Sequence, residues 1–85
     1  MLHQNFPNPF NPSTKIAFDL PTASVVTLTV YNLLGQQVGT LLNTTTMDAG
    51  MHAIAFDAAP LGTGVYFYKL QANNFVSVKK MMLIK

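Results

Sequence analysis

The chain has 85 residues, of which 49% are hydrophobic and only 9% are charged, and its formal net charge is +2. This length fits one small domain, and a chain this apolar is not a disordered tail. It has no Cys, which excludes a disulfide framework and a thiolate metal site. The weak charge and the lack of Arg argue against nucleic acid as a partner. No apolar run approaches the about 18 residues of a membrane-spanning helix, and no secretory leader pattern opens the chain.

The first fourteen residues are rich in Asn and Pro. Pro7, Pro9 and Pro12 lack backbone N–H donors and push the residues before them into extended geometry. The sequence therefore predicts an extended strap over residues 1–14, with Phe6 and Phe10 as its anchors. This strap is expected to pack on residues 15–85, so that the whole chain forms a single domain.

Beyond the strap, apolar and polar residues alternate with the period of two that is typical of strands. We predict strands over residues 15–20, 25–31, 36–42, 52–57, 65–72 and 75–85. Gly39 inside the third strand indicates a bulge or a sheet edge. Each strand has an apolar face that should point inward, made of Ile16, Phe18 and Leu20, of Val26, Leu28 and Val30, of Ile54 and Phe56, and of Tyr66, Tyr68, Leu70 and Ala72.

The segments between these strands carry turn residues. Gly35 closes the turn after residue 31 and suits a positive φ, and Asn73-Asn74 fits a two-residue hairpin turn. Residues 43–46 are expected to be a polar connector, residues 48–50 a second turn, and residues 58–64 a loop. Six or seven short strands separated by such turns predict an all-β fold, an antiparallel β-sandwich of about seven short strands.

One spacing favours an immunoglobulin-like version of the sandwich. In that fold a Tyr near the start of strand F bonds its hydroxyl back to the backbone of a corner, and the residue two places later enters the core. Gly62-x-Gly64-x-Tyr66-x-Tyr68 has this spacing, with Tyr68 where antibody domains carry Cys. We expect Tyr66 to make the corner bond and Lys69 to point to water.

The residue content offers little chemistry. A zinc site needs three or four converging ligands, and this chain has two His and three scattered Asp. Asp48 and Asp57 are expected to bond loop amides beside turns rather than form a catalytic pair. Gly62-Thr63-Gly64 precedes a strand and not a helix, so it is no phosphate cradle. We therefore expect no enzyme activity, no catalytic or metal site, no cofactor and no small-molecule substrate.

The C-terminus holds three of the five lysines in its last seven residues, around a four-residue apolar run. Lysines on a final strand can simply blunt an exposed sheet edge. The same strand can also be a handle that another protein binds by strand pairing and charge. The two interpretations are compatible, and the candidate recognition residues are Lys79, Lys80, Met81, Met82, Leu83, Ile84 and Lys85.

The aromatic residues allow a second hypothesis. Exposed rings on a sandwich can stack on sugars, which would make the chain a carbohydrate-binding or adhesion module of an extracellular enzyme. Alternation along the fifth strand sends Tyr66 and Tyr68 to the core, leaving Phe67 and Tyr31 as the outward rings. A third hypothesis is a structural spacer whose copies pack together, whereas a sorting module should be a monomer.

Four blocks in one order carry a family resemblance. They are residues 5–14, 30–35, 64–70 and 79–85, and they include Asn8, Pro9, Phe10, Asn11, Pro12, Gly35, Gly64, Tyr66 and Tyr68. In these blocks the chain resembles the C-terminal sorting domains (type A) of the bacterial type IX secretion system. That family overlaps in fold with the immunoglobulin-like domain of flagellar hook-capping proteins. The resemblance covers the chain from about Gln4 to Lys85.

The resemblance implies a non-catalytic sorting signal at the C-terminal end of a larger exported cargo protein. Such a cargo reaches the periplasm through a signal peptide of its own, so Met1 is expected to follow other sequence in the native gene. The implied partners are the outer-membrane translocon and a sortase-type peptidase, and the implied destination is the cell surface or the medium.

Carried over by position, the family's glycine–tyrosine block corresponds to Gly64 and Tyr66, and its terminal basic strand to Lys79, Lys80 and Lys85. The chain departs from the family at several positions. Four residues separate Lys80 from Lys85 where relatives often have three. Other departures are Gly62, Phe56 and Lys69, where relatives often show Pro, Trp and Arg.

Overall fold

The computed structural model describes residues 1–85 as an all-β chain with six antiparallel strands. The all-β prediction is confirmed, with six strands in place of about seven. None of its elements is a helix that could cross a membrane. The strands are β1 (Ser13–Leu20), β2 (Ser24–Asn32), β3 (Gln37–Met47), β4 (Gly50–Asp57), β5 (Gly64–Ala72) and β6 (Phe75–Leu83).

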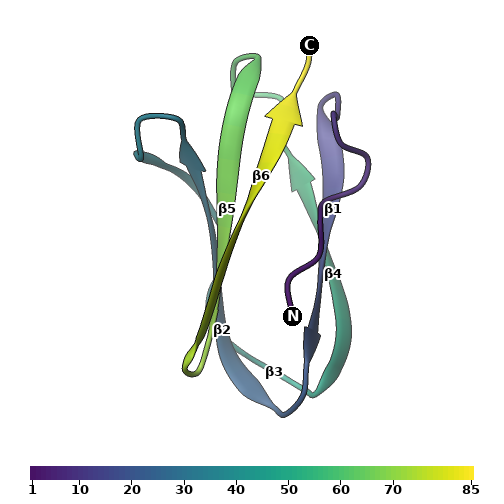
Figure 1. The fold of residues 1–85 in the computed structure, drawn as a ribbon, viewed down its shortest axis with the longest axis vertical. Helices are drawn as coiled ribbons and strands as arrows, with labels where there is room; N and C mark the ends of the chain where they lie inside the picture. The colour runs from purple at the N-terminus through teal and green to yellow at the C-terminus, as the bar shows by residue number, and fades with distance from the viewer.

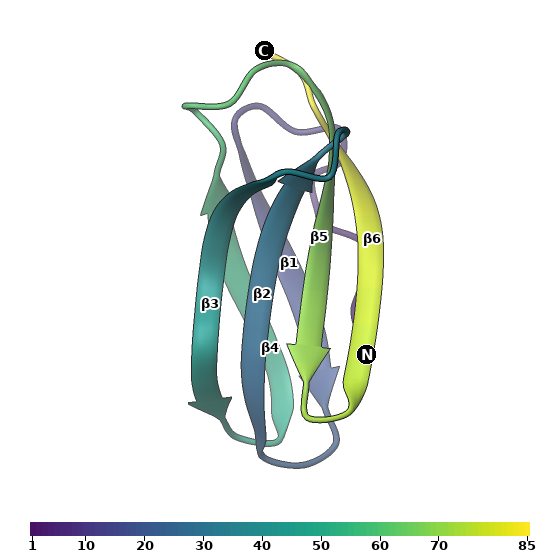
Figure 2. The ribbon, with the colours of Figure 1, turned by 90° about the vertical axis from the view of Figure 1, so that its left-hand side faces the viewer.

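The strands form two sheets that face each other (Figure 1). β1 and β4 make a two-stranded sheet, and the other four strands form a sheet in the order β3-β2-β5-β6. Figure 2 shows the larger sheet face-on, with β3 and β6 at its two edges and the smaller sheet behind it. The face of each sheet that points to the other sheet is called its inner face below, and the opposite one its outer face.

The core fills the space between the inner faces. The predicted inward residues lie there: Ile16, Phe18, Leu28, Tyr68 and Leu70 are completely buried. Ile54 is only partly buried but packs against the same cluster. Burial of one large apolar side chain stabilises a fold by roughly 1.5–3 kcal/mol, so a continuous core of this kind is what an 85-residue chain needs.

β3 is longer than the sequence predicted. Residues 43–46 were expected to connect two strands, but they continue β3, with Thr46 opposite Val25 and Thr45 opposite Val26. Threonine is a good strand former on a solvent-exposed edge, where no apolar alternation is required. The pairing with β2 shifts register at several points, one of them beside Gly39, as expected of an irregular edge strand.

The predicted turns are also present. Gly35 has a φ of 82° and Asn73 a φ of 53°, values in the left-handed region that these two residue types tolerate. Asn73 and Asn74 form the short turn between β5 and β6. β6 ends at Leu83, two residues before the predicted end at Lys85.

The strap of residues 1–14 packs along the open side between the two sheets, and its last two residues already belong to β1. Leu2 and Phe6 pair with Phe18 and Lys15 of β1 in antiparallel fashion. Further along, Phe10 pairs with Leu83 of β6 in parallel fashion. The strap therefore crosses from the smaller sheet to the larger one and closes this side of the molecule.

One of the two predicted anchors of the strap is wrong. Phe10 is 2% exposed, with its ring centroid 6.4 Å from that of Phe56, but Phe6 is 80% exposed. The backbone of Phe6 exchanges two hydrogen bonds with Lys15. Consecutive side chains of an extended chain point to opposite sides, and here the inward one is Asn5, at 2% exposure. The polar side chain goes inside because it finds buried partners there.

Candidate interaction surface

Tyr66 and Tyr68 are both buried, and their hydroxyl groups tie loops to the core. The Tyr66 hydroxyl donates to the Gly62 carbonyl at 2.7 Å, which confirms the expected corner bond. The Tyr68 hydroxyl donates to the His3 carbonyl at 2.7 Å and accepts from the Asn5 N–H at 2.8 Å. Burial raises the pKa of Tyr68, so the phenol stays protonated and keeps its donor role.

Asn5 continues this buried network. Its side-chain amide donates to the Thr14 hydroxyl at 3.1 Å and to the Pro7 carbonyl at 3.2 Å. The Thr14 hydroxyl in turn donates to the same Pro7 carbonyl at 2.9 Å. Tyr68, Asn5 and Thr14 thus hold the strap from inside, and no local sequence pattern predicts this role of Asn5.

The motif residues of the strap fall into two groups. Asn8 accepts a hydrogen bond from the Met82 N–H at 2.9 Å, and the Pro12 carbonyl accepts one from the Ala58 N–H at 2.9 Å. Pro9 and Asn11 are exposed. Of the two motif glycines, Gly35 lies in the turn after β2, and Gly64 begins β5 opposite Leu83. Asn8 and Pro12 therefore link the strap to β6 and to the loop after β4, whereas Pro9 and Asn11 lie at the surface.

The seven candidate recognition residues at the C-terminus do not share one environment. Met81 and Leu83 are core residues, at 1% and 0% exposure. Lys80, Met82, Ile84 and Lys85 are exposed, although the Lys85 amine donates to the Ala59 carbonyl. Lys79 is half-buried and lies opposite the inward Tyr68, whereas Lys80 lies opposite the outward Phe67. The two neighbouring lysines therefore point to opposite faces of β6.

The strap covers part of the edge of β6 that points away from β5. The Gln4 side chain donates to the Lys80 carbonyl at 2.7 Å. Phe10 donates to the Met82 carbonyl at 3.0 Å and accepts from the Ile84 N–H at 2.9 Å. With the bond from the Met82 N–H to Asn8, the edge of the backbone is occupied from the Lys80 carbonyl to the Ile84 N–H. The exposed edge expected for the C-terminal strand is therefore absent at these residues.

The outer face of the larger sheet carries the two candidate sugar-binding rings. Tyr31 and Phe67 are direct cross-strand partners and are both half-buried. The Lys69 amine lies 5.3 Å from the centre of the Tyr31 ring, so Lys69 packs on this ring and does not simply point to water. The hydrogen bond from Thr29 lowers the pKa of Tyr31, with a smaller contribution from Lys69, and outweighs desolvation.

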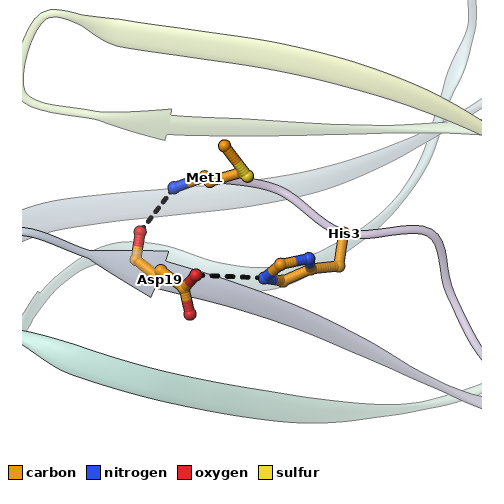
Figure 3. Close-up of polar contacts among 3 residues, drawn as sticks. All are labelled: Met1, His3 and Asp19. Carbon is orange, nitrogen blue, oxygen red and sulfur yellow. Dashed lines mark hydrogen bonds and ion pairs between the residues drawn. The ribbon is translucent and has the colours of Figure 1, made fainter.

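The titratable residues do not converge on a reactive site. His3 Nε2 lies 3.2 Å from Asp19 Oδ2, and the Asp19 backbone carbonyl accepts from the Met1 amine (Figure 3). The His52 ring instead contacts the Asp48 carbonyl at 2.8 Å. Asp57 accepts from the Ala59 N–H at 3.0 Å, as expected beside a turn, but the Asp48 carboxylate makes no such bond. Nowhere do three His, Cys, Asp or Glu side chains gather.

A surface hollow with a volume of about 570 Å³ lies beside the turn between β5 and β6. Leu20, Pro21, Asn73 and Phe75 are among its lining residues, and Asp19 is its single ionisable side chain. The Asp19 carboxylate contacts His3, whose ring does not line the hollow. The hollow is an open groove.

Comparison with known proteins places the chain in a family. No curated protein matches it. The family model described as "Secretion system C-terminal sorting domain" matches residues 4–85, which include most of the strap and all six strands. Since this match covers nearly the whole length, the chain belongs to the family of secretion system C-terminal sorting domains.

Proposed function

We propose that the chain is a non-catalytic sorting signal that directs a larger cargo protein through the type IX secretion system. The observation that carries this proposal is the match of residues 4–85 to the sorting-domain family. In the proposed route the cargo passes the periplasm and the outer membrane, is recognised by the translocon and is processed by a sortase-type peptidase. The cargo then stays at the cell surface or is released.

The proposal includes an immunoglobulin-like fold with two parts, the strap over residues 1–14 and the sandwich over residues 15–85. The corner bond between Tyr66 and Gly62 supports this fold, since it is a recurrent feature of such sandwiches. Pairing of the strap with both β1 and β6 supports the view that the two parts make one domain. A rigid domain presents a fixed surface to a receptor at low entropic cost.

Within the signal, the proposed handle is the C-terminal segment from Lys79 to Lys85. Its exposed members, Lys80, Met82, Ile84 and Lys85, are available to a receptor, while Met81 and Leu83 hold the segment to the core. Deletion of the whole segment would therefore remove two core side chains as well as the handle. Substitutions at exposed positions separate recognition from folding.

The first prediction concerns the two central lysines of the handle. Replacement Lys79→Ala together with Lys80→Ala should lower surface display of a tagged cargo severalfold in a host with an active type IX system. The fold should remain, because changes at exposed or half-exposed positions usually alter stability by no more than about 0.5 kcal/mol. The measurement is surface labelling of the cargo, with circular dichroism of the purified variant. Lys15→Ala, an exposed lysine on the smaller sheet, is the matched control.

Undiminished display of the double variant would count against the handle. Retention of the cargo even with the unmodified domain attached would count against the sorting function itself. The single changes Lys79→Ala and Lys80→Ala then show which face of β6 the receptor contacts.

The alternative candidate is a carbohydrate-binding or adhesion module. The pairing of Tyr31 with Phe67 on an outer face favours it, because stacked sugars bind such rings. The Lys69 amine over the Tyr31 ring works against it, since it covers part of the surface that a sugar would need. Sedimentation with an insoluble polysaccharide separates the candidates: the sorting function requires no affinity, and the alternative requires affinity that Phe67→Ala abolishes.

A further inference from the structure

β6 is the last strand of the larger sheet, and only part of its outer edge is covered. The backbone atoms that bond the strap are the carbonyls of Lys80 and Met82 and the Met82 N–H in β6, and the N–H of Ile84 just after it. In an antiparallel sheet the N–H and C=O of one residue point to the same side, and the side alternates along the strand. The residues of β6 whose N–H and C=O groups point away from β5 are therefore the even-numbered ones.

Val76 and Val78 are also even-numbered, so their backbone N–H and C=O groups point away from β5. They precede the stretch of β6 that the strap covers, which begins at Lys80. No strand lies beyond β6 in the sheet, and the backbone contacts of the strap with β6 reach no further back than Lys80. The N–H and C=O groups of Val76 and Val78, together with the Lys80 N–H, are thus free to pair. The side chains of Val76 and Val78 are 55% and 54% exposed. An apolar strand edge left open in this way is a site for strand addition.

The charge around this edge is of one sign. The four strands of the larger sheet contain Lys69, Lys79 and Lys80 and no acidic residue. The three aspartates lie in β1, in β4 and in the turn between β3 and β4. Lys79 and Lys80 point to the two faces of β6, so both faces of an added strand would meet a positive charge.

We propose that the open edge of β6, from Val76 to Lys80, binds an extended segment of a protein partner that carries adjacent carboxylate side chains between apolar ones. The free backbone groups supply the hydrogen bonds, and the exposed valines and Met82 supply apolar contact. Lys79 and Lys80 select acidic partners. This inference rests on the proposed sorting function, because it places the receptor contact upstream of the segment that the strap covers.

Two other occupants fit the surface less well. A second copy of the chain would bring its own Lys79 and Lys80 to the same sheet, where like charges repel. An anionic membrane would satisfy the lysines but would leave the backbone groups of Val76 and Val78 without partners. Both become outcomes of the test.

The test uses the isolated 85-residue domain and a synthetic peptide with blocked ends, in which two adjacent glutamates are flanked by alternating valine and threonine. The measurement is the change of backbone amide signals in NMR spectra during titration. We expect the largest changes at Val76, Val78 and Lys80. A peptide with two lysines in place of the glutamates should cause little change.

Val78→Pro removes the outward N–H and leaves the β5–β6 hydrogen bonds in place, because proline is tolerated where the N–H faces solvent. Val78→Thr, which keeps both the N–H and the branched shape, is its matched control. Loss of edge pairing should weaken peptide binding about tenfold in the proline variant, the size of one to two hydrogen bonds, and leave the threonine variant unchanged. Lys80→Ala should weaken binding of the glutamate peptide, and Lys15→Ala should not.

Several results would overturn the proposal. These are equal binding of the two peptides, equal binding to Val78→Pro and Val78→Thr, dimerisation through β6, or binding to phosphatidylglycerol vesicles that Val78→Pro leaves intact. None of these depends on export in cells. Failure of the peptide test with normal export of the cargo would therefore reject strand addition at β6 and keep the sorting function. Peptide binding as expected, without export of the cargo, would reject the sorting function and keep strand addition at β6.

Discussion

Tyr68 and His3 hold the same strap in different ways, and their surroundings decide which contact matters more. The Tyr68 hydroxyl is buried and satisfies one donor and one acceptor of the strap backbone. The His3–Asp19 pair has side chains that are 40% and 42% exposed. Exposed ion pairs contribute about 0–1 kcal/mol, whereas a buried polar group left without its partner costs about 1–3 kcal/mol.

We therefore predict that Tyr68→Phe lowers the free energy of unfolding by about 1–3 kcal/mol and that His3→Ala lowers it by less than about 1 kcal/mol. The measurement is urea unfolding of both variants at neutral pH. A larger loss for His3→Ala than for Tyr68→Phe would reverse this ranking.

The raised pKa of Tyr68 gives the same contact a pH dependence. An acid whose pKa is raised by folding is more easily ionised in the unfolded chain. Its contribution is complete below the ordinary tyrosine pKa near 10 and is lost as the pH rises through the higher folded value. Stability should therefore fall in alkali in the wild type, and this part of the fall should be missing in Tyr68→Phe.

At the scale of the elements, the strap offers an internally controlled experiment. It contains two phenylalanines four residues apart, one 2% and the other 80% exposed. Phe10→Ala should lower the free energy of unfolding by about 3–5 kcal/mol, since it leaves a cavity against Phe56. Phe6→Ala should change it by no more than about 0.5 kcal/mol. Thermal and urea unfolding of the two variants measures the difference, and similar losses would mean that the strap packs in another way.

These elements also show how far the sequence is informative. β1, β2 and β5 could be predicted with their inward faces, because a half-buried strand must alternate. The length of β3 could not, since residues 43–46 are polar and look like a connector until β2 is seen beside them. The orientation of Phe6 depends on its pairing with Lys15, nine residues away, and no local pattern contains that information.

The candidate surface was predictable only in part. The clustering of lysines on the last strand could be seen in the sequence, and so could the resemblance to sorting domains. That the strap occupies the edge from Lys80 to Ile84 could not, because these contacts join the two ends of the chain. The open edge at Val76 and Val78 follows from those contacts and is therefore a result of the fold alone.

At the scale of the whole molecule, the two ends of the chain are paired with each other. Phe10 and Leu83 run in parallel and lie side by side, joined through Met82 and Ile84. A force that pulls the N-terminus and the C-terminus apart would draw these two segments along each other in opposite directions. The hydrogen bonds between them are then loaded together, in shear, instead of being broken one after another.

Such a domain should resist a pulling force applied between its N-terminus, where a cargo would be attached, and its C-terminus. Asn8→Ala removes the side-chain bond to the Met82 N–H and should lower the force at which the domain yields. Single-molecule pulling between the termini measures this force, with Asn11→Ala as a control at an exposed strap residue. An equal rupture force for both variants would mean that the hydrogen bond between Asn8 and Met82 bears no mechanical load.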